Sequence, residues 1–226
     1  MAAVTIAETL QQAVQRLAVV PVGDGYVFEA LHAYTDADGK PVFWRIRCKH
    51  RGTGGKWIRP LCRRGSDYVL SEPERASHGL PLYRLPELRG TEEGVPVIVT
   101  EGEWCADHLH RLGMVATTSG SASSAAKVDW SPLRGRAVRI WRDRDAAGLS
   151  YAKDVTRRLQ ALDCAVAWID VEALDLPEGG DAVDWLAQHP GATAADILTL
   201  PWTAPDFGDA AKTGANSTSR PLSQLI

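Results

Sequence analysis

The sequence has few cysteines and none of the spacings that usually accompany a cysteine site. The 226-residue chain contains four cysteines, and no two of them form a C-x-x-C pair. Scattered cysteines in a chain of this length are typical of a cytoplasmic protein with free thiols. A zinc site would have to combine Cys48, His50 and Cys62, and the sequence offers no clear fourth ligand. We therefore expect these side chains to be buried or incidental.

Long apolar runs are also missing. No stretch approaches the roughly 20 apolar residues that a membrane-spanning helix needs, so we expect no membrane partner. Residues 1–17 lack the basic start and apolar stretch of a secretory signal. No Gly-x-x-x-x-Gly-Lys-Ser/Thr segment occurs either, so we expect no helicase ATPase within this sequence.

Acidic residues are absent between Gly39 and Ser66, although the whole chain has a formal net charge of −3. Nine of the 25 basic residues fall in this interval, which leaves 16 basic residues against all 28 acidic residues elsewhere. The interval therefore carries +9 and the remainder −12, which predicts a basic module joined to an acidic one. Eight of the nine are expected to contact nucleic acid or nucleotides: Arg45, Arg47, Lys49, Arg51, Lys56, Arg59, Arg63 and Arg64.

The basic module is predicted to be small and α+β. Residues 5–18 have apolar side chains at helical spacing, which predicts a helix. Residues 26–50 alternate apolar and polar side chains around an Asp/Gly turn, which predicts a β-hairpin, and residues 56–59 are typical of a further strand. Because basic residues occupy every second position from Arg45 to Lys49, one face of that strand should be strongly basic.

Two interpretations of this module remain open. Its charges would either bind phosphates or form a solvated face, and the absence of interrupting acids favours phosphate binding. Trp44 and Trp57 would either stack on bases or pack beneath the sheet, and burial is favoured for both.

The remainder of the chain is predicted to be an α/β domain. Strands are expected at 95–100, 114–119, 137–141 and 165–171, and helices at 103–112, 147–162, 181–188 and 194–200. Strands that alternate with helices indicate a parallel sheet with helices on its faces. The expected divisions are a module with its connector (1–94), the α/β domain (95–200) and a polar linker (201–226), with the native chain continuing past Ile226.

Acidic residues follow two of the predicted strands directly. Glu101 comes after the strand 95–100, and Asp143 and Asp145 come after the strand 137–141. In a parallel sheet ligands gather at the carboxyl ends of the strands, so these side chains should meet at one edge. Carboxylate oxygens are the ligands that Mg²⁺ prefers, and Mn²⁺ is an alternative ion, so the sequence predicts a divalent metal site for phosphoryl transfer.

Further residues lie beside the predicted metal site. Asp181 opens the helix 181–188 and is either a helix cap or a further acid of the metal site, with Asp184 as the fallback. Gly102 and Gly148 follow the acidic positions and are expected to let the backbone approach a phosphate closely.

Three segments resemble the three signature segments of the TOPRIM domain. They are VIVTEGEWCADHL, IWRDRDAAGLSYAKDV and GGDAVDWL, in the order and strand context of that family. Within it, the chain looks most similar to DNA primases of phages, plasmids and integrated elements, over roughly residues 26–200. The resemblance implies a TOPRIM-type parallel sheet. It also implies that Glu101 is the catalytic acid/base and that Asp143 and Asp145 hold the metal, with Asp181 as a further acid of the metal site.

By the same resemblance, the expected activity is that of a nucleotidyltransferase that makes short primers on a single-stranded DNA template from nucleoside triphosphates. A helicase-type ATPase, fused or associated, is the implied partner. Two alternatives stay open. The same carboxylates would serve a nuclease with water as the nucleophile, and a non-catalytic nucleic-acid-binding module of a replication complex would not need them.

The chain departs from the primase pattern in two respects. Such primases commonly have small or neutral residues before and between the two aspartates, whereas this chain has Arg142 and Arg144. These arginines would either contact triphosphate or template, or pair with acidic residues. The zinc-binding module of cellular primases is also missing from the sequence, so the resemblance does not extend to recognition of specific start sites.

Overall fold

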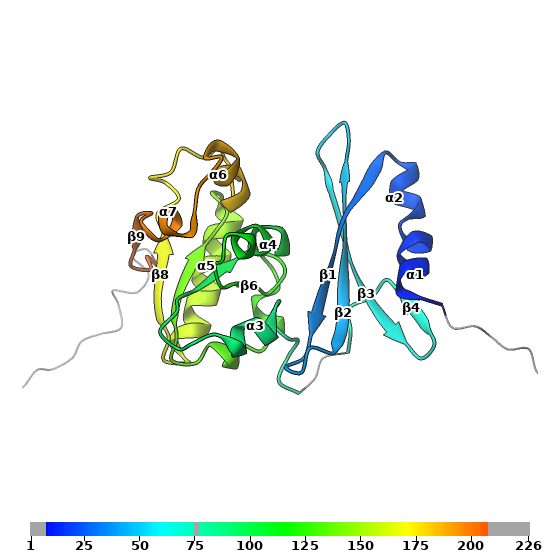
Figure 1. Cartoon of the computed structure of the whole chain (residues 1–226), viewed down its shortest axis with the longest axis horizontal. Helices are drawn as coiled ribbons and strands as arrows, with labels where there is room; N and C mark the ends of the chain where they lie inside the picture. Colours follow the sequence, from blue (N-terminus) through cyan, green and yellow to red (C-terminus); the bar gives the residue numbers. More distant parts are fainter. Residues whose placement is uncertain (1–7, 75–76, 208–226) are drawn as a thin grey trace, which may run out of the picture.

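The computed structural model of the chain describes residues 8–74 and 77–207, which form two sheets (Figure 1). One sheet is small and antiparallel, and the other is mostly parallel with helices around it. The predicted fold class is therefore confirmed: an α/β domain whose sheet is mostly parallel, preceded by a smaller α+β module. No helix among the described residues is long and apolar enough to span a bilayer.

The N-terminal sheet is an antiparallel meander in the order β1-β2-β3-β4. Its strands are β1 (Tyr26–Thr35), β2 (Pro41–His50), β3 (Lys56–Arg64) and β4 (Asp67–Val69). The predicted hairpin is confirmed, and its turn is closed by the Asp36 side chain, which accepts hydrogen bonds from the backbone N–H groups of Asp38 and Lys40. Gly39 completes the turn at φ +80°, a conformation that glycine adopts without strain.

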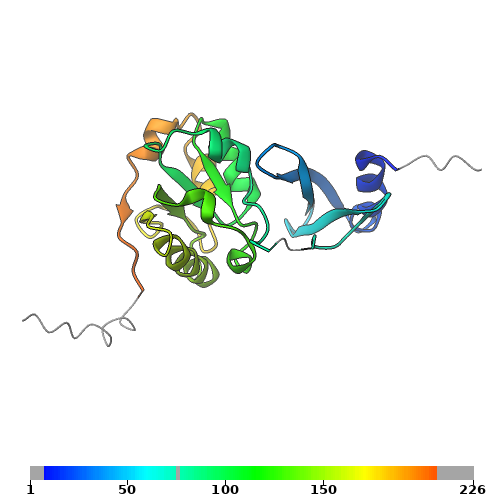
Figure 2. The same ribbon diagram turned by 90° about the horizontal axis from the view of Figure 1, so that it is seen from below.

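Two helices cover one face of this sheet, α1 (Leu10–Leu17) and α2 (Val19–Gly23) (Figures 1 and 2). Thr9 is the N-cap of α1, and its side chain and that of Gln12 cap each other's backbone N–H groups. Of the predicted helix 5–18, residues 5–7 lie outside the described residues. Alternation along β2 sends Trp44, Ile46 and Cys48 to the side of α1, where they form a separate core cluster. The preference for burying Trp44 is thus confirmed.

The opposite face of the N-terminal sheet packs on the α/β domain. Tyr34, Phe43 and Cys62 belong to the large core cluster that also contains the strands of the parallel sheet. Because the two sheets share one buried core, the β2–β3 hairpin has a defined place relative to the α/β domain (Figure 2).

The α/β domain is built on a five-stranded sheet in the order β6-β5-β7-β8-β9. Four strands run parallel: β5 (Val97–Thr100), β6 (Ala116–Thr118), β7 (Ala137–Trp141) and β8 (Ala165–Ile169). The central strand β5 is buried throughout, as is typical of such sheets. The helices are α4 (Glu103–Arg111), α5 (Ala146–Gln160), α6 (Ala182–Gln188) and α7 (Ala194–Leu198), with short 3₁₀ turns at Ala125–Lys127 and Ser131–Leu133.

The structure differs from the predicted divisions at both ends of this domain. The expected connector contains α3 (Leu85–Gly90), and Leu80, Leu82 and Leu88 from the same stretch are buried in the α/β core. At the other end, β9 (Trp202–Thr203) pairs antiparallel with β8, although residues 201–226 were expected to form a linker. A two-residue strand is too short to leave a periodic signal in the sequence. The rest of that predicted linker, 208–226, lies outside the described residues.

Candidate active site

The register of the parallel sheet brings the first two predicted acids together. β5 and β7 are neighbours, with Thr100 opposite Trp141, so the residues that follow leave the sheet at the same edge. Oε1 of Glu101 accepts a hydrogen bond from the backbone N–H of Asp143 at 3.1 Å. Two residues that are 42 positions apart in sequence are therefore held in direct contact.

Asp145 and Asp181 join this group from the starts of two helices. Asp145 caps α5, and its Oδ1 accepts from the N–H of Gly148 at 2.7 Å. Asp181 caps α6 by accepting from Val183 at 2.7 Å. The loops before α5 and α6 are joined by two backbone hydrogen bonds. The N–H of Arg144 donates to the carbonyl oxygen of Gly180 at 2.9 Å, and the N–H of Gly179 donates to the carbonyl oxygen of Arg144 at 3.0 Å.

The fallback residue Asp184 has a different place. It is exposed, and its carboxylate accepts from the backbone N–H of Asp181 at 3.0 Å, which completes the capping box of α6. Asp181, by contrast, acts electrostatically on Glu101, Asp143 and the buried thiol of Cys105. The structure thus places Asp181, rather than Asp184, with the other acids, and its role as a cap does not keep it out of the site.

Burial, with mutual repulsion added to it, raises the pKa of two of these acids, Glu101 and Asp143. Burial, followed by repulsion from Glu101 and Asp181, raises the pKa of Asp143 to about 8, although Lys56 lowers it in part. Burial also raises the pKa of Glu101, against the hydrogen bond from Asp143. Among the described residues, none of these carboxylates forms an ion pair with a basic side chain. A cation at this edge would relieve their repulsion.

The donor set suits a hard divalent cation that substrate helps to hold. Within 8–74 and 77–207, no three acidic, histidine or cysteine side chains come close enough together to enclose a metal ion. Mg²⁺ does not require such a cage, because it usually keeps several waters and is bound through one or two carboxylates and substrate phosphates. Asp143 and Asp145 would be those carboxylates, with Glu101 and Asp181 beside them.

The two glycines near the acids have unequal environments. A Cβ at Gly148 would lie 2.5 Å from Oε1 of Glu101 and would overlap the carbonyl oxygen of Asp143. A Cβ at Gly102 would meet nothing within 4 Å. Gly148 is thus required by the packing of the acids themselves, which differs from the predicted close approach to a phosphate.

Arg142 and Arg144 pair with an acid of the same domain. Glu172 accepts from Nη2 of Arg142 at 2.9 Å and from Nε of Arg144 at 3.0 Å. Arg144 also donates to the carbonyl oxygen of Leu176 at 2.7 Å. Of the two alternatives for these arginines, the structure contains the pairing with an acid. Their contact with nucleic acid stays a prediction.

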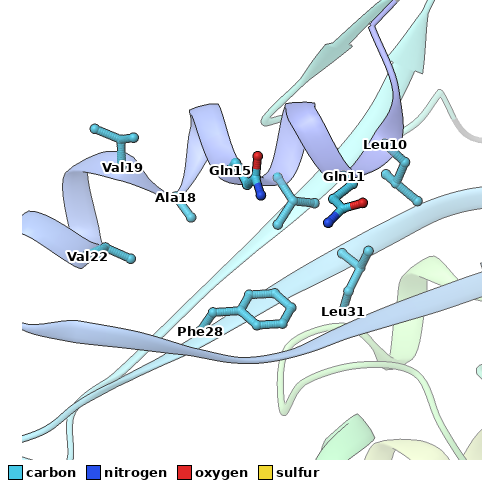
Figure 3. Close-up of a pocket in the computed structure, with 9 residues that line it drawn as sticks. Leu10, Gln11, Gln15, Ala18, Val19, Val22, Phe28 and Leu31 are labelled. Atoms are coloured by element: carbon cyan, nitrogen blue, oxygen red, sulfur yellow. The ribbon is translucent and has the colours of Figure 1, made fainter.

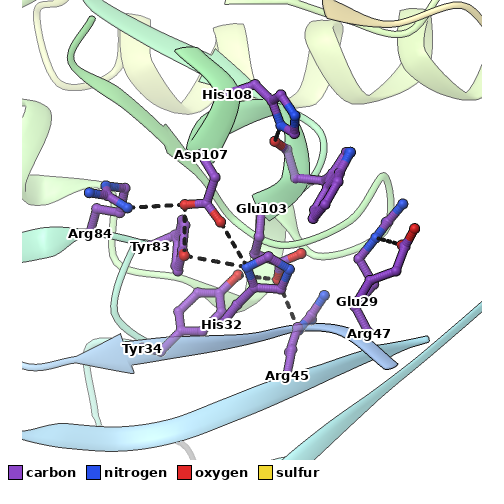
Figure 4. A network of polar contacts seen from close by, with 12 residues as sticks. Glu29, His32, Tyr34, Arg45, Arg47, Tyr83, Arg84, Glu103, Asp107 and His108 are labelled. Carbon is purple, nitrogen blue, oxygen red and sulfur yellow. Dashed lines mark hydrogen bonds and ion pairs between the residues drawn. The ribbon is translucent and has the colours of Figure 1, made fainter. Parts of the chain in front are cut away.

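The predicted basic face of β2 is covered at two of its three basic residues, Arg45 and Arg47, whereas Lys49 is exposed. Arg45 donates to the carbonyl oxygen of Gly120 at 2.6 Å. Arg47 donates to Glu29 at 2.8 Å (Figure 4). The guanidinium of Arg47 also lies over the Trp104 ring, 4.9 Å from its centroid. Alternation had identified the face correctly, but not that the α/β domain covers it. We therefore remove Arg45 and Arg47 from the expected nucleic-acid surface.

The remaining predicted basic residues are exposed: Lys49, Arg51, Lys56, Arg59, Arg63 and Arg64. We call them the exposed basic set. None of the six has an ion-pair partner in the described part of the chain. Lys49 and Lys56 lie directly opposite each other on β2 and β3, and Lys56 is close enough to act on Asp143. The end of the hairpin thus brings positive charge to the acidic edge.

Sequence reasoning missed the polar contacts that join the two sheets (Figure 4). Asp107 on α4 accepts from Tyr83 at 2.9 Å and from Arg84 at 3.0 Å, and Nδ1 of His32 on β1 lies 3.1 Å from its other oxygen. Burial opposes ionisation of Asp107, but the hydrogen bonds from His32 and Tyr83 lower its pKa overall. No periodic or motif signal relates side chains that are 75 positions apart, as His32 and Asp107 are.

A separate cavity lies away from the acids. It is an apolar groove of about 540 Å³ between the N-terminal helices and β1, lined by residues such as Val14, Val22 and Phe28 (Figure 3). It contains no acidic, basic or nucleophilic side chain, so it offers nothing for phosphoryl transfer.

Solved structures that are similar to this chain are DNA primase domains. A DNA primase domain from Pseudomonas aeruginosa has 19% sequence identity and a TM-score of 0.48, over 79% of this chain and 52% of that one. The DnaG catalytic core has 16% identity and a TM-score of 0.40, over 73% and 48%. The DnaG primase catalytic domain bound to single-stranded DNA has 15% identity and a TM-score of 0.41, over 80% and 59%.

This chain therefore spans about half of the length of the solved structures it matches. No protein-family model and no curated protein matches it. At these identities and TM-scores, the activity has to be argued from the chain's own site.

Proposed function

We propose that the chain is a metal-dependent nucleotidyltransferase of the DNA primase type, which makes short primers on single-stranded DNA. The observation that carries the proposal is the convergence of Glu101, Asp143, Asp145 and Asp181 at one sheet edge, where two of them have raised pKa values. Lys56 of the exposed basic set supplies the opposite charge beside them, since it lowers the pKa of Asp143 in part. An acidic site for a cation next to a basic surface for phosphates is the combination that phosphoryl transfer needs.

In the proposed reaction, the 3′-hydroxyl of the growing strand attacks the α-phosphate of an incoming nucleoside triphosphate, and pyrophosphate leaves. Mg²⁺ or Mn²⁺, when bound, neutralises the charge that develops on the phosphate oxygens. Asp143 and Asp145 are the carboxylates assigned to hold it. Glu101 is assigned to receive the proton of the hydroxyl, a role that suits a carboxylate whose pKa is raised by burial.

The exposed basic set is assigned to the phosphates of the template and of the nucleotide. Lys49 and Lys56 form a cross-strand pair of like charge. Neither has an ion-pair partner in the described part of the chain, although Lys56 acts on Asp143 from a greater distance. Such a pair is costly unless an anion lies between or beside the two lysines. Trp57 is half-buried with Arg59 over its ring at 5.4 Å, so base stacking is not assigned to it.

A primer-synthesis assay tests the proposal. Wild-type protein is incubated with labelled single-stranded DNA, nucleoside triphosphates and Mg²⁺ or Mn²⁺, beside Glu101→Gln, Asp145→Asn and the matched control Asp184→Asn. We expect longer products from wild type and the control, and a loss of roughly 100-fold or more in the two site variants. Shortened DNA would instead indicate a nuclease. DNA binding without any metal-dependent product, or full activity in Glu101→Gln, would overturn the proposal.

A further inference from the structure

A buried polar cluster joins the N-terminal sheet to the α/β domain next to the candidate site (Figure 4). The Tyr34 hydroxyl on β1 donates to Oε1 of Glu103 at 2.6 Å. The Arg45 side chain on β2 lies 3.4 Å from the same oxygen as an ion pair. Tyr34 is fully buried, and Glu103 is 2% exposed. A carboxylate in this position is tolerated only because both partners are present.

The fit around Gly120 shows how close this contact is. Arg45 donates to its carbonyl oxygen, and a Cβ on Gly120 would lie 2.6 Å from Nη1 of Arg45 and 2.8 Å from the Tyr34 hydroxyl. Gly120 also has φ +110°, a conformation that residues with a side chain rarely adopt. Nothing larger than glycine fits here without displacing the cluster.

The partners of Tyr34 and Arg45 lie on the same sheet edge as the acids. Glu103 is the first residue of α4 and follows Glu101 by two positions. Gly120 follows the end of β6, where its N–H donates to the Thr118 side chain at 2.9 Å. The strands β6 and β5 are neighbours. The cluster therefore connects the N-terminal sheet to the segments that follow these two strands, one of which contains Glu101.

We propose that Tyr34, Arg45 and Glu103 are positioning residues. They hold the N-terminal sheet, and with it Lys56, at a fixed place beside the edge of the parallel sheet where the acids lie. They act through Glu101 and Lys56 and do not contact the reacting atoms. A buried, charge-paired cluster adds little net stability compared with apolar packing, but it accepts only one arrangement of its partners. This arrangement has two consequences. The fixed distance between the hairpin and the α/β domain does not depend on the proposed function, whereas the effect on primer synthesis rests on it.

The geometric consequence is tested by pulsed electron paramagnetic resonance. Spin labels are placed at exposed positions through Thr53→Cys on the hairpin and Glu178→Cys near α6, since the native cysteines are all buried. Tyr34→Phe removes one hydrogen bond and keeps the ring that stacks on Phe43. Tyr68→Phe is the matched control on β4, at the α1 side of the sheet.

We expect one narrow distribution of label distances in the labelled protein without further substitution and in Tyr68→Phe. In Tyr34→Phe and Glu103→Gln the distribution should be broader by about twofold or more, because a buried hydrogen bond to a carboxylate is lost or weakened. Circular dichroism verifies that each variant is folded. Should Glu103→Gln fail to fold, Tyr34→Phe alone decides. An unchanged distribution in folded Tyr34→Phe would overturn the inference.

The catalytic consequence is tested by a double-mutant cycle with Lys56→Gln. We expect Tyr34→Phe to raise KM for DNA and nucleotide by about tenfold and to leave Mg²⁺ binding unchanged. Lys56→Gln should then raise KM by a smaller factor in Tyr34→Phe than in wild type, because a displaced Lys56 already contributes less to binding. Full additivity would contradict the coupling. If wild type makes no primers while the label distances behave as expected, the proposed function fails and the positioning role stands.

Discussion

At the scale of single residues, Asp143 links the stability of the protein to its site. Its pKa is about 8 in the folded chain against an ordinary value of 3.8, so the folded state keeps a proton that the unfolded state releases above about pH 4. Stability from this group is therefore present at low pH and is lost as pH rises toward 8. We expect Asp143→Asn to stabilise the metal-free protein at pH 8 by about 1–3 kcal/mol, and by less at pH 5.

Thermal unfolding in chelator and in Mg²⁺, at both pH values, measures this effect. Mg²⁺ should stabilise the wild type by binding only the folded state, and Asp143→Asn should lose most of that gain. Asp184→Asn serves as the control, since that side chain is exposed and contributes to a helix cap. A less stable Asp143→Asn at pH 8 would show that the carboxylates do not repel one another as described.

The two glycines beside the acids give a second prediction at the residue scale. Gly148→Ala places a methyl group against Oε1 of Glu101 and the backbone of Asp143, so we expect a loss of about 1–3 kcal/mol and displacement of the glutamate. Gly102→Ala adds the same methyl group in open space at φ −136°, and should cost less than about 1 kcal/mol. Denaturant unfolding and primer synthesis are compared in both; equal losses would contradict the packing argument.

At the scale of elements, the β2–β3 hairpin should show a conflict between stability and binding. Lys49 and Lys56 face each other directly, and like charges in that position destabilise a sheet. We expect Lys49→Glu to raise the free energy of unfolding by about 0.2–1 kcal/mol while weakening the binding of single-stranded DNA.

Lys40→Glu is the matched control for this pair, because Lys40 lies at the β1–β2 turn, the opposite end of β2. Unfolding in denaturant and fluorescence anisotropy with labelled DNA measure the two effects. A hairpin that gains stability and binds DNA as before would exclude Lys49 from the binding surface.

The elements also show how far sequence patterns reach. Periodicity and turn residues predicted the hairpin, the parallel strands and the edge at which Glu101 and Asp143 meet, because these depend on neighbouring positions and on parallel topology. The face that carries Arg45 was predicted too. What covers that face was not, because alternation assigns a side chain to a face and contains no information about the element packed against it. Glu172, which pairs with Arg142 from 30 positions away, was missed for the same reason.

At the scale of the whole molecule, the net charge of −3 conceals an uneven distribution that should govern DNA binding. The exposed basic set belongs to a segment of +9, and the rest of the chain carries −12, so DNA should bind in one orientation and with steep salt dependence. Each phosphate contact on a single strand contributes about 0.7 to the slope of log K against log salt. Replacing a contacting residue should lower the slope by about that amount.

We therefore expect Arg51→Gln and Arg64→Gln each to reduce this slope, and Arg134→Gln to leave it unchanged. Arg134 is a suitable control because its side chain is 59% exposed and it lies on the α/β domain, beside Asp163. Titrations of labelled single-stranded DNA at several salt concentrations give the slopes. Equal reductions in all three variants would mean that binding follows total charge. A reduction confined to Arg51→Gln and Arg64→Gln would locate the DNA on the basic module, along β3 from the turn beside Lys56 to the opposite end of the strand.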